Sequence, residues 1–350
     1  MSRPLAADAG RDAEIDAFIA RAGWGGATRA PLADDASFRR YERLRLDDRR
    51  AVLMDAPPGR EDVRPFVAVD RLLRRRGLSA PEILAEDLEA GFLLLEDFGD
   101  ATMTRLLARG EDEGALYRLA TDALIHLHRR FSPREADASG LPIYDEALYL
   151  TEAALFTDWW WPAVFDAPCP PDVRLEYLGQ VANALQATAG APRTLVLRDY
   201  HVDNILRLDG REGVAACGLL DFQDAVVGPA AYDLVSLFED ARRDVDSGVA
   251  QAEMRRYFEA FPTLDPAAFA AAYSALGAQR ALKVIGIFTR LDRRDGKSQY
   301  LRHIDRVWRW LETDLAHPQL AGLRAFLDRT VPPARRTAPN RSPGAGVPTL

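Results

Sequence analysis

The spacing of apolar residues changes along the chain, and the change separates a strand-rich first part from a helix-rich remainder. In the first part, residues 11–22 and 62–76 have the apolar spacing of amphipathic helices, and Gly77 is placed to cap the second. Five β-prone runs bounded by turn residues predict strands at 27–32, 41–46, 51–54, 83–86 and 91–97. After Thr102 the pattern becomes helical. We therefore expect a small antiparallel sheet with a helix, followed by a larger, mainly helical region.

A hairpin interrupts the helical part. The runs 205–208 and 214–220 are β-prone and surround an Asp-Gly turn, which is a typical hairpin signal. A hairpin returns the chain to the place where it began. Asn204 and Asp221 should therefore face each other across its open end, with Asp199 one tight loop away.

The chemistry of these three side chains indicates a metal–phosphate site. Two carboxylates and one amide oxygen are hard ligands, and Mg²⁺ is commonly held by one or two carboxylates together with substrate phosphates. The alternative is a structural hairpin with solvated aspartates at its ends. The combination of a D-x(4)-N motif with an apolar strand that ends in Asp221-Phe222 favours the metal site.

Composition narrows the class of protein. A chain of 350 residues is expected to form one large or two medium units, and its net charge of −8 argues against a nucleic-acid partner. Two cysteines are too few for a disulfide framework. No run reaches the roughly 18 apolar residues of a membrane span, and a signal-peptide pattern is absent. We expect a cytoplasmic protein with no membrane partner; the oligomeric state is left open, with a monomer as the expectation.

The motifs resemble those of a known family. The D-x(4)-N motif from Asp199 to Asn204, followed by strand, turn, strand and Asp221-Phe222, is similar to the catalytic and metal loops of protein-kinase-like phosphotransferases. Over roughly residues 13–329 the order of elements resembles the aminoglycoside phosphotransferase and choline kinase family. Within it, the chain looks most similar to the bacterial anomeric kinases for N-acetylmuramate and N-acetylglucosamine of cell-wall recycling. The stretches that carry this similarity are 36–41, 52–58, 220–225, 232–237, 286–291 and 295–297.

The resemblance implies an α+β, protein-kinase-like bilobal fold with a small antiparallel-sheet lobe and a larger helical lobe. Residues 1–97 would form the N-terminal ATP-binding lobe, and residues 98–330 the C-terminal catalytic and substrate lobe. Residues 331–350 contain five prolines and little apolar content, so we expect them to be a disordered tail.

The resemblance also assigns roles to residues. Asp199 would accept the proton of the acceptor hydroxyl, and Asn204 and Asp221 would hold Mg²⁺ on the ATP phosphates. Asp233 would bind the backbone of the catalytic loop, although a simple helix N-terminal charge is the alternative. The turn at 36–40 and a hinge at 96–99 would contact ATP, whereas a surface hairpin and a buried edge strand followed by a turn are the plainer interpretations. The ATP-binding candidates are Ser37, Phe38, Arg39, Arg40, Met54, Glu96 and Phe98.

Five residues are candidates for binding a sugar. His201, Asp203 and Asp224 lie close in sequence to the catalytic and metal residues, so they could bind sugar hydroxyls. Trp159 and Trp160 could present an aromatic face to a sugar ring, and packing in the core fits them equally well.

The chain departs from the kinase pattern in its first lobe. The third strand usually carries a phosphate-binding lysine, but Met54 stands in that region and no lysine precedes Lys283. Arg39, Arg40 and Arg43 are the candidates to supply the missing charge.

The histidine that is usual two residues before the catalytic aspartate is Leu197, and a glycine-rich phosphate loop is lacking. The sequence thus predicts an ATP- and Mg²⁺-dependent sugar 1-kinase of peptidoglycan recycling. The alternatives are a kinase for another small alcohol, such as an aminoglycoside or choline, and a nucleotide-binding pseudokinase.

Overall fold

The structure is a computed structural model, and it describes residues 6–32, 38–132 and 140–340. It divides into two compact units, Met1–Asp112 with Asp203–Asp224, and Glu113–Val202 with Ala225–Leu350. The predicted boundary at residue 97 therefore differs from the observed one. The reason is that the hairpin of residues 205–220 pairs with the chain on both sides of residue 97: Ser79 bridges to Gly218, and Thr102 bridges to Leu206.

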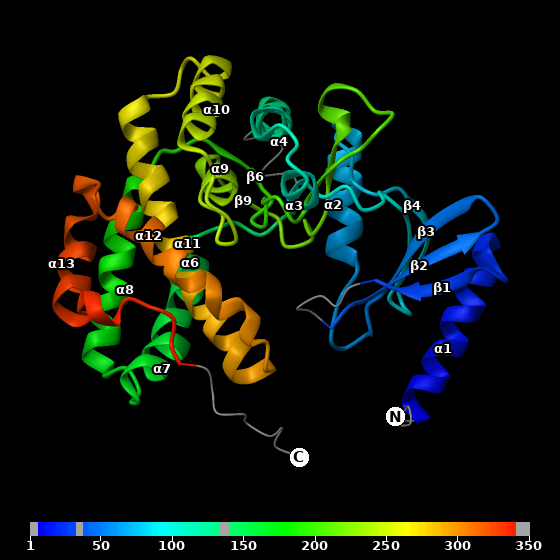
Figure 1. The fold of residues 1–350 in the computed structure, drawn as a ribbon, viewed down its shortest axis with the longest axis horizontal. Helices are drawn as coiled ribbons and strands as arrows, with labels where there is room; N and C mark the ends of the chain where they lie inside the picture. Colours follow the sequence, from blue (N-terminus) through cyan, green and yellow to red (C-terminus); the bar gives the residue numbers. More distant parts are fainter. Residues whose placement is uncertain (1–5, 33–37, 133–139, 341–350) are drawn as a thin grey trace. The chain divides into compact units, whose positions relative to one another are not determined.

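The first unit contains the predicted five-stranded antiparallel sheet (Figure 1). The strands are hydrogen-bonded in the order β1-β2-β3-β5-β4. A short turn joins β2 to β3, with Asp47 in the left-handed region (φ 52°). The strand bounds are β1 Thr28–Pro31, β2 Arg40–Leu46, β3 Arg49–Asp55, β4 Ile83–Asp87 and β5 Phe92–Glu96.

Two helices accompany this sheet. Helix α1 (Ala6–Ile19) continues into the π-turn η1 (Ala20–Trp24), and together they bury one face of the sheet. The alternation of side chains along the strands supplies that face. Its core is Ile15, Phe18, Ile19, Trp24, Leu44, Ala51, Leu53, Phe92 and Leu94. Helix α2 (Arg64–Arg75) is followed by Gly77, whose φ of 79° is the left-handed conformation typical of a helix C-terminal cap.

The predicted hairpin is present in the first unit. Strands β7 (Ile205–Arg207) and β8 (Cys217–Leu219) are antiparallel, with the short helix η4 (Gly213–Ala216) before the second strand. The backbone of Arg207 also bonds to Ala101, which precedes helix α3 (Met103–Ala108). The ring of Phe222 stacks on Phe66 of α2 at 4.8 Å. The open end of the hairpin is thereby fixed on both sides.

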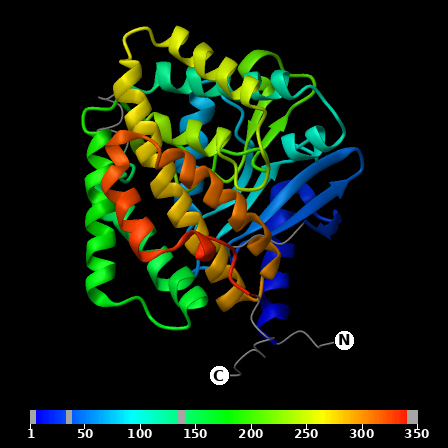
Figure 2. The same cartoon turned by 60° about the vertical axis from the view of Figure 1, so that its left-hand side comes forward.

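The second unit is mainly helical, and its longest element is α11 (Pro266–Asp295). Helices α8 and α13 lie side by side at one end of it (Figure 2). The two-stranded pair β6 (Arg193–Val196) and β9 (Val226–Pro229) leads into the loop that carries Asp199. The remaining helices are α4 Glu113–Arg130, α6 Glu146–Leu155, η2 Phe156–Trp160, α7 Trp161–Phe165, α8 Pro171–Leu185, α9 Ala231–Phe238, α10 Ser247–Ala260, α12 Ile304–Asp314 and α13 Ala321–Thr330, with short turns η3 Gln186–Thr188, η5 Ser298–His303, η6 Pro318–Leu320 and η7 Pro333–Arg335.

The prediction of a disordered tail is wrong for residues 331–340. Val331 is fully buried, and Arg336 forms ion pairs of 2.5 Å with Glu312 and 2.6 Å with Asp328. The carbonyl of Thr337 accepts a bond of 3.1 Å from Trp160. These contacts with distant residues outweigh the local composition. Residues 341–350 lie outside the described residues. Within the part of the chain that the structure describes, no helix is long and apolar enough to span a membrane.

Candidate active site

The hairpin brings Asn204 and Asp221 together as the sequence predicted. Their side chains meet at 3.4 Å, from the amide Nδ2 to the carboxylate Oδ2, and the backbone N–H of Leu220 donates to the carbonyl of Asn204 at 2.9 Å. Both side chains are half-buried. Their two oxygen-bearing side chains could bind Mg²⁺, and phosphate oxygens and water would complete its coordination.

The backbone at Asp221 is strained. Its φ is 57°, in the left-handed region that few residues other than glycine adopt. Gln223 holds the carboxylate by donating a hydrogen bond of 2.8 Å to its Oδ1. Strain of this kind is found at functional sites, where the surrounding structure maintains it.

Asp199 lies in a tight loop of the second unit, and residues 200–203 connect it to Asn204 in the first. Arg198 precedes it with a φ of 69°. The carboxylate of Asp233 accepts the backbone N–H groups of Leu197 (2.7 Å) and Arg198 (2.9 Å). The contact predicted for Asp233 is therefore present, and Asp233 itself is completely buried on α9.

A second set of bonds fixes the same loop. Ser236 donates to the carbonyl of Arg198 at 3.2 Å and accepts from Arg280 of α11 at 2.9 Å. The loop before Asp199 is thus held at two N–H groups and one carbonyl. An arginine with a positive φ is uncommon, and these bonds account for it.

Three charged side chains form a buried cluster beside the loop. Glu152 of α6 pairs with Lys283 of α11 at 2.8 Å and with the guanidinium of Arg198. Burial alone would raise the pKa of Glu152, but Lys283 and Arg198 lower it, so the carboxyl is ionised. Burial alone would lower the pKa of Lys283, but Tyr232, Glu152 and Asp199 raise it. The cluster thus places two cations and one anion at one side of the loop.

Glu152 and Lys283 were not predicted from the sequence as site residues. The signal was present, because Lys283 is one of two lysines and lies in an otherwise apolar stretch of α11. A cation on the buried face of a helix requires a partner, although its identity cannot be read from sequence.

The candidate ATP residues of the turn before β2 have acidic partners. Phe38 is 61% exposed, and its backbone N–H donates to Glu61 at 3.2 Å. Arg39 pairs with Glu61 at 3.5 Å, and Arg40 pairs with Asp55 at 2.6 Å. Ser37 lies outside the described residues.

The position of the missing lysine is apolar. Met54 is buried on β3, opposite Tyr41 and Leu93 in the sheet. The third candidate for the missing charge, Arg43, pairs with Asp97 at 2.8 Å and with Asp100 at 3.0 Å.

The predicted hinge is tied to the hairpin. Glu96 pairs with Arg211, and the guanidinium of Arg211 lies 5.3 Å from the centre of the Phe98 ring. The backbone N–H of Glu96 donates to Glu82 at 2.8 Å. The structure thus links the strand end at Glu96 to the loop between β7 and β8.

The candidate sugar-binding residues differ in how far they are exposed to solvent. Asp224 is exposed, and Asp203 is half-buried and accepts a hydrogen bond from Thr104. His201 is buried, with 4% of its surface exposed, and burial keeps its pKa well below the usual value. A neutral, buried imidazole offers little surface to a sugar.

The two candidate tryptophans differ in burial. Trp160 is completely buried, stacks on Phe156 at 4.6 Å and contacts Trp308 at 5.2 Å. Its prediction as a sugar-binding residue is therefore wrong, because the core of the second unit encloses it. Trp159 is half-buried and remains a candidate.

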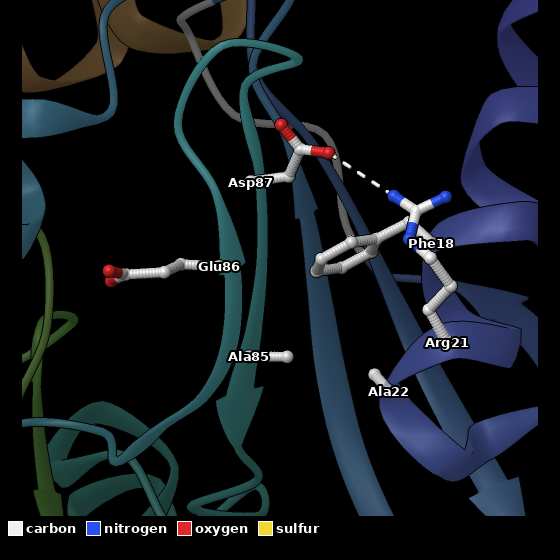
Figure 3. Close-up of a pocket in the computed structure, with 6 residues that line it drawn as sticks. All are labelled: Phe18, Arg21, Ala22, Ala85, Glu86 and Asp87. Carbon is white, nitrogen blue, oxygen red and sulfur yellow. Dashed lines mark hydrogen bonds and ion pairs between the residues drawn. The ribbon is translucent and has the colours of Figure 1, made fainter.

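A small pocket of the first unit lies apart from these residues. It lies between α1–η1 and β4, and Phe18, Arg21, Ala22, Ala85, Glu86 and Asp87 line it (Figure 3). Arg21 and Asp87 close one side with an ion pair of 3.2 Å. None of the candidate site residues contributes to it.

Known structures share this fold. A choline/ethanolamine kinase family protein from Mesorhizobium loti matches with a TM-score of 0.60 and 17% identity, over 92% of this chain and all of the other. The GDP complex of aminoglycoside 2'-phosphotransferase-IIIa matches with a TM-score of 0.58 and 16% identity, over 87% of this chain and 98% of the other. The predicted protein-kinase-like fold is thereby confirmed.

The sequence itself matches closer relatives. A protein of Pseudomonas aeruginosa named N-acetylmuramate/N-acetylglucosamine kinase is 40% identical over 89% of this chain and 91% of its own length. A Caulobacter vibrioides protein of the same name is 38% identical over 92% of this chain and 97% of its own length. Residues 28–270 match the model of the phosphotransferase enzyme family.

Fold, motif and relatives together define an enzyme that transfers a phosphoryl group to a small molecule. The chain belongs to the phosphotransferase enzyme family.

Proposed function

We propose that this protein is an ATP-dependent kinase that phosphorylates the anomeric C1 hydroxyl of N-acetylmuramate and N-acetylglucosamine in peptidoglycan recycling. The observation that carries the proposal is the match to relatives of that name over nearly the whole chain. The retained Asp199, Asn204 and Asp221 support activity over a pseudokinase role. Because ATP is the donor, the reaction is expected in the cytoplasm.

In the proposed reaction, Asp199 accepts the proton of the anomeric hydroxyl as its oxygen bonds to the γ-phosphorus. The bond from the γ-phosphorus to the bridging oxygen breaks, and ADP leaves. Arg198, Asp233 and Ser236 fix the loop that orients Asp199. Asn204 and Asp221 would hold Mg²⁺, which when bound supplies positive charge to the phosphate oxygens.

The nucleotide would bind in the first unit. The strand end at Glu96 and Phe98 would offer backbone groups to the adenine, and Arg39 and Arg40 belong to the turn proposed to cover the phosphates. The acidic partners of the two arginines would be exchanged for phosphate oxygens, which accept the same bidentate geometry.

A coupled assay with a blocked substrate tests the proposal. The protein, ATP and Mg²⁺ should produce ADP and sugar phosphate in equal amounts from N-acetylmuramate and N-acetylglucosamine. The product should lose its reducing-end reactivity, since C1 carries the phosphate. Methyl glycosides of the same sugars have no C1 hydroxyl and should not react. Equal turnover of the methyl glycosides would exclude anomeric transfer, and no ADP with either free sugar would refute the kinase assignment.

A further inference from the structure

Arg290 is a half-buried cation for which the described part of the chain supplies no acidic partner. Its Nε is shielded from solvent, and the described residues provide neither a hydrogen-bond acceptor nor an ion pair for it. Its neighbours on α11 differ: Arg294 pairs with Asp295 at 2.8 Å, and Arg293 donates to the carbonyl of Asn340 at 2.8 Å. Burial and the charge of Arg294 lower the pKa of Arg290, while Asp295 opposes the shift. Such a guanidinium is stabilised by an anion that it can bind.

The position of Arg290 follows from the register of two helices. Gln279 of α11 donates to the carbonyl of Tyr149 at 3.1 Å, and Lys283 pairs with Glu152. At the next step, an added Cβ on Gly286 would collide with the backbone of Leu155. The contacts advance in the same direction along both helices, so α11 runs parallel to α6 and its continuation, η2.

Continued by one more turn, this register would bring Arg290 level with Trp159. Residues 279, 283, 286 and 290 share one face of α11, because their spacings of four, three and four residues follow the helical repeat. Leu155 and Trp159 are likewise four residues apart. Trp159 lies in the π-turn η2, a helical irregularity that is frequent at functional sites. The two half-buried side chains thus belong to one stretch of the second unit.

The same face of α11 leads back to Asp199. The charge of Asp199 contributes to raising the pKa of Lys283, and Arg290 follows Lys283 seven residues later on α11. Seven residues correspond to about 10 Å along a helix. A hexosamine ring with a three-carbon acid on C3, together with the long side chain of Arg290, would cover this interval, with C1 at Asp199 and the carboxylate at Arg290. Trp159 would meet the apolar face of the ring.

We propose that Arg290 binds the lactyl carboxylate of N-acetylmuramate and that Trp159 supports the ring, so that this pair determines the preference between the two amino sugars. The inference rests on the proposed function. A guanidinium matches a carboxylate with two parallel hydrogen bonds. N-acetylglucosamine has no carboxylate and cannot use that contact.

The test compares kcat/KM for both sugars in Arg290→Gln, Arg290→Lys and the matched control Arg294→Gln. Arg290→Gln should lower the value for N-acetylmuramate about 10- to 100-fold, the range expected for a charge-assisted bond, and change that for N-acetylglucosamine by less than about 3-fold. Arg290→Lys keeps a point charge without the planar fork, so it should recover part of the loss. Arg294→Gln should leave both values within about 3-fold, because Asp295 already neutralises that guanidinium.

Binding and melting measurements complete the design. In calorimetry, the wild type should bind N-acetylmuramate more tightly than N-acetylglucosamine, and Arg290→Gln should remove the difference. Its melting temperature should equal or exceed that of the wild type, since an unpaired half-buried charge is removed. Equal losses on both sugars, an unchanged value for N-acetylmuramate, or the same loss in Arg294→Gln would overturn the proposal. If the wild type binds the two sugars with this preference but phosphorylates neither, the proposed function fails while the Arg290 contact stands.

Discussion

The Oδ1 atom of Asp233 accepts a hydrogen bond of 2.9 Å from the backbone N–H of Arg198, the residue directly before Asp199. The other carboxylate oxygen accepts the N–H of Leu197 at 2.7 Å. Asp233 is fully buried, so these bonds form away from solvent. They hold Arg198 in the left-handed conformation that turns the chain toward Asp199.

Replacing Asp233 should therefore destabilise the catalytic loop and slow the reaction. Asp233→Ala leaves two buried N–H groups without acceptors, and each such group costs about 1–3 kcal/mol. The free energy of unfolding should fall by about 2–6 kcal/mol, with kcat falling further than the loss of folded protein explains. Asp233→Asn keeps one acceptor oxygen and should be intermediate. Full activity and stability of Asp233→Ala would contradict this account of the loop.

Removal of the Asp221 carboxylate should abolish turnover. Asp221→Ala deletes a charged ligand proposed to hold Mg²⁺, and Asn204 alone offers only a neutral oxygen. The fold should persist because Asp221 is half-buried at the end of a hairpin. Asp209→Ala is the matched control, since Asp209 lies in the turn of the same hairpin and its side chain is 86% exposed. Activity of folded Asp221→Ala close to that of Asp209→Ala would refute the metal assignment.

Asp199→Asn tests the proposed base. The change keeps the size and a hydrogen-bonding oxygen but removes the charge and the proton acceptor. General-base assistance is typically worth about 10²–10⁴ in rate, so kcat should fall within that range. The affinity for ATP, measured by equilibrium binding, should change little because Asp199 belongs to the second unit. An unchanged kcat would remove Asp199 from the mechanism.

Asp70 should make stability depend on pH. It is 1% exposed on α2, its Oδ2 has no hydrogen-bond partner among the described residues, and burial raises its pKa to about 7 despite Arg74 and Arg71. The unfolded pKa is about 3.9, so between pH 4 and 7 the folded state binds the proton that the unfolded state has lost. The stabilising effect of this proton is complete below pH 4 and is lost as the pH rises to 7.

Asp70→Asn does not titrate, so its stability relative to wild type should increase with pH. The slope is about 1.4 kcal/mol per pH unit, which gives roughly 2–3 kcal/mol between pH 5 and 7 in denaturant unfolding. The exposed Asp48→Asn, in the turn between β2 and β3, is the control and should show a constant difference. A constant difference for Asp70→Asn as well would show that Asp70 is ionised in the folded protein.

Local patterns were sufficient to predict much of the first unit and the hairpin. The five strands and α2 follow from short-range apolar periodicity and from turn residues such as Gly77, which act over a few positions. The meeting of Asn204 and Asp221 follows from a turn of known type between two strands. These features depend on residues close in sequence, and they could therefore be predicted.

Long-range packing determined the rest. Nothing near Arg43 in sequence indicates Asp97 as its partner, and nothing near Lys283 indicates Glu152. Packing likewise enclosed Trp160 but left Trp159 half-buried, although the two are neighbours. Burial and charge pairing depend on which distant segments fold against each other. The residues proposed to carry out the reaction could be predicted because they lie in a local sequence motif. The contacts proposed to select the sugar depend on how α6–η2 packs against α11, and these segments are more than a hundred residues apart in sequence.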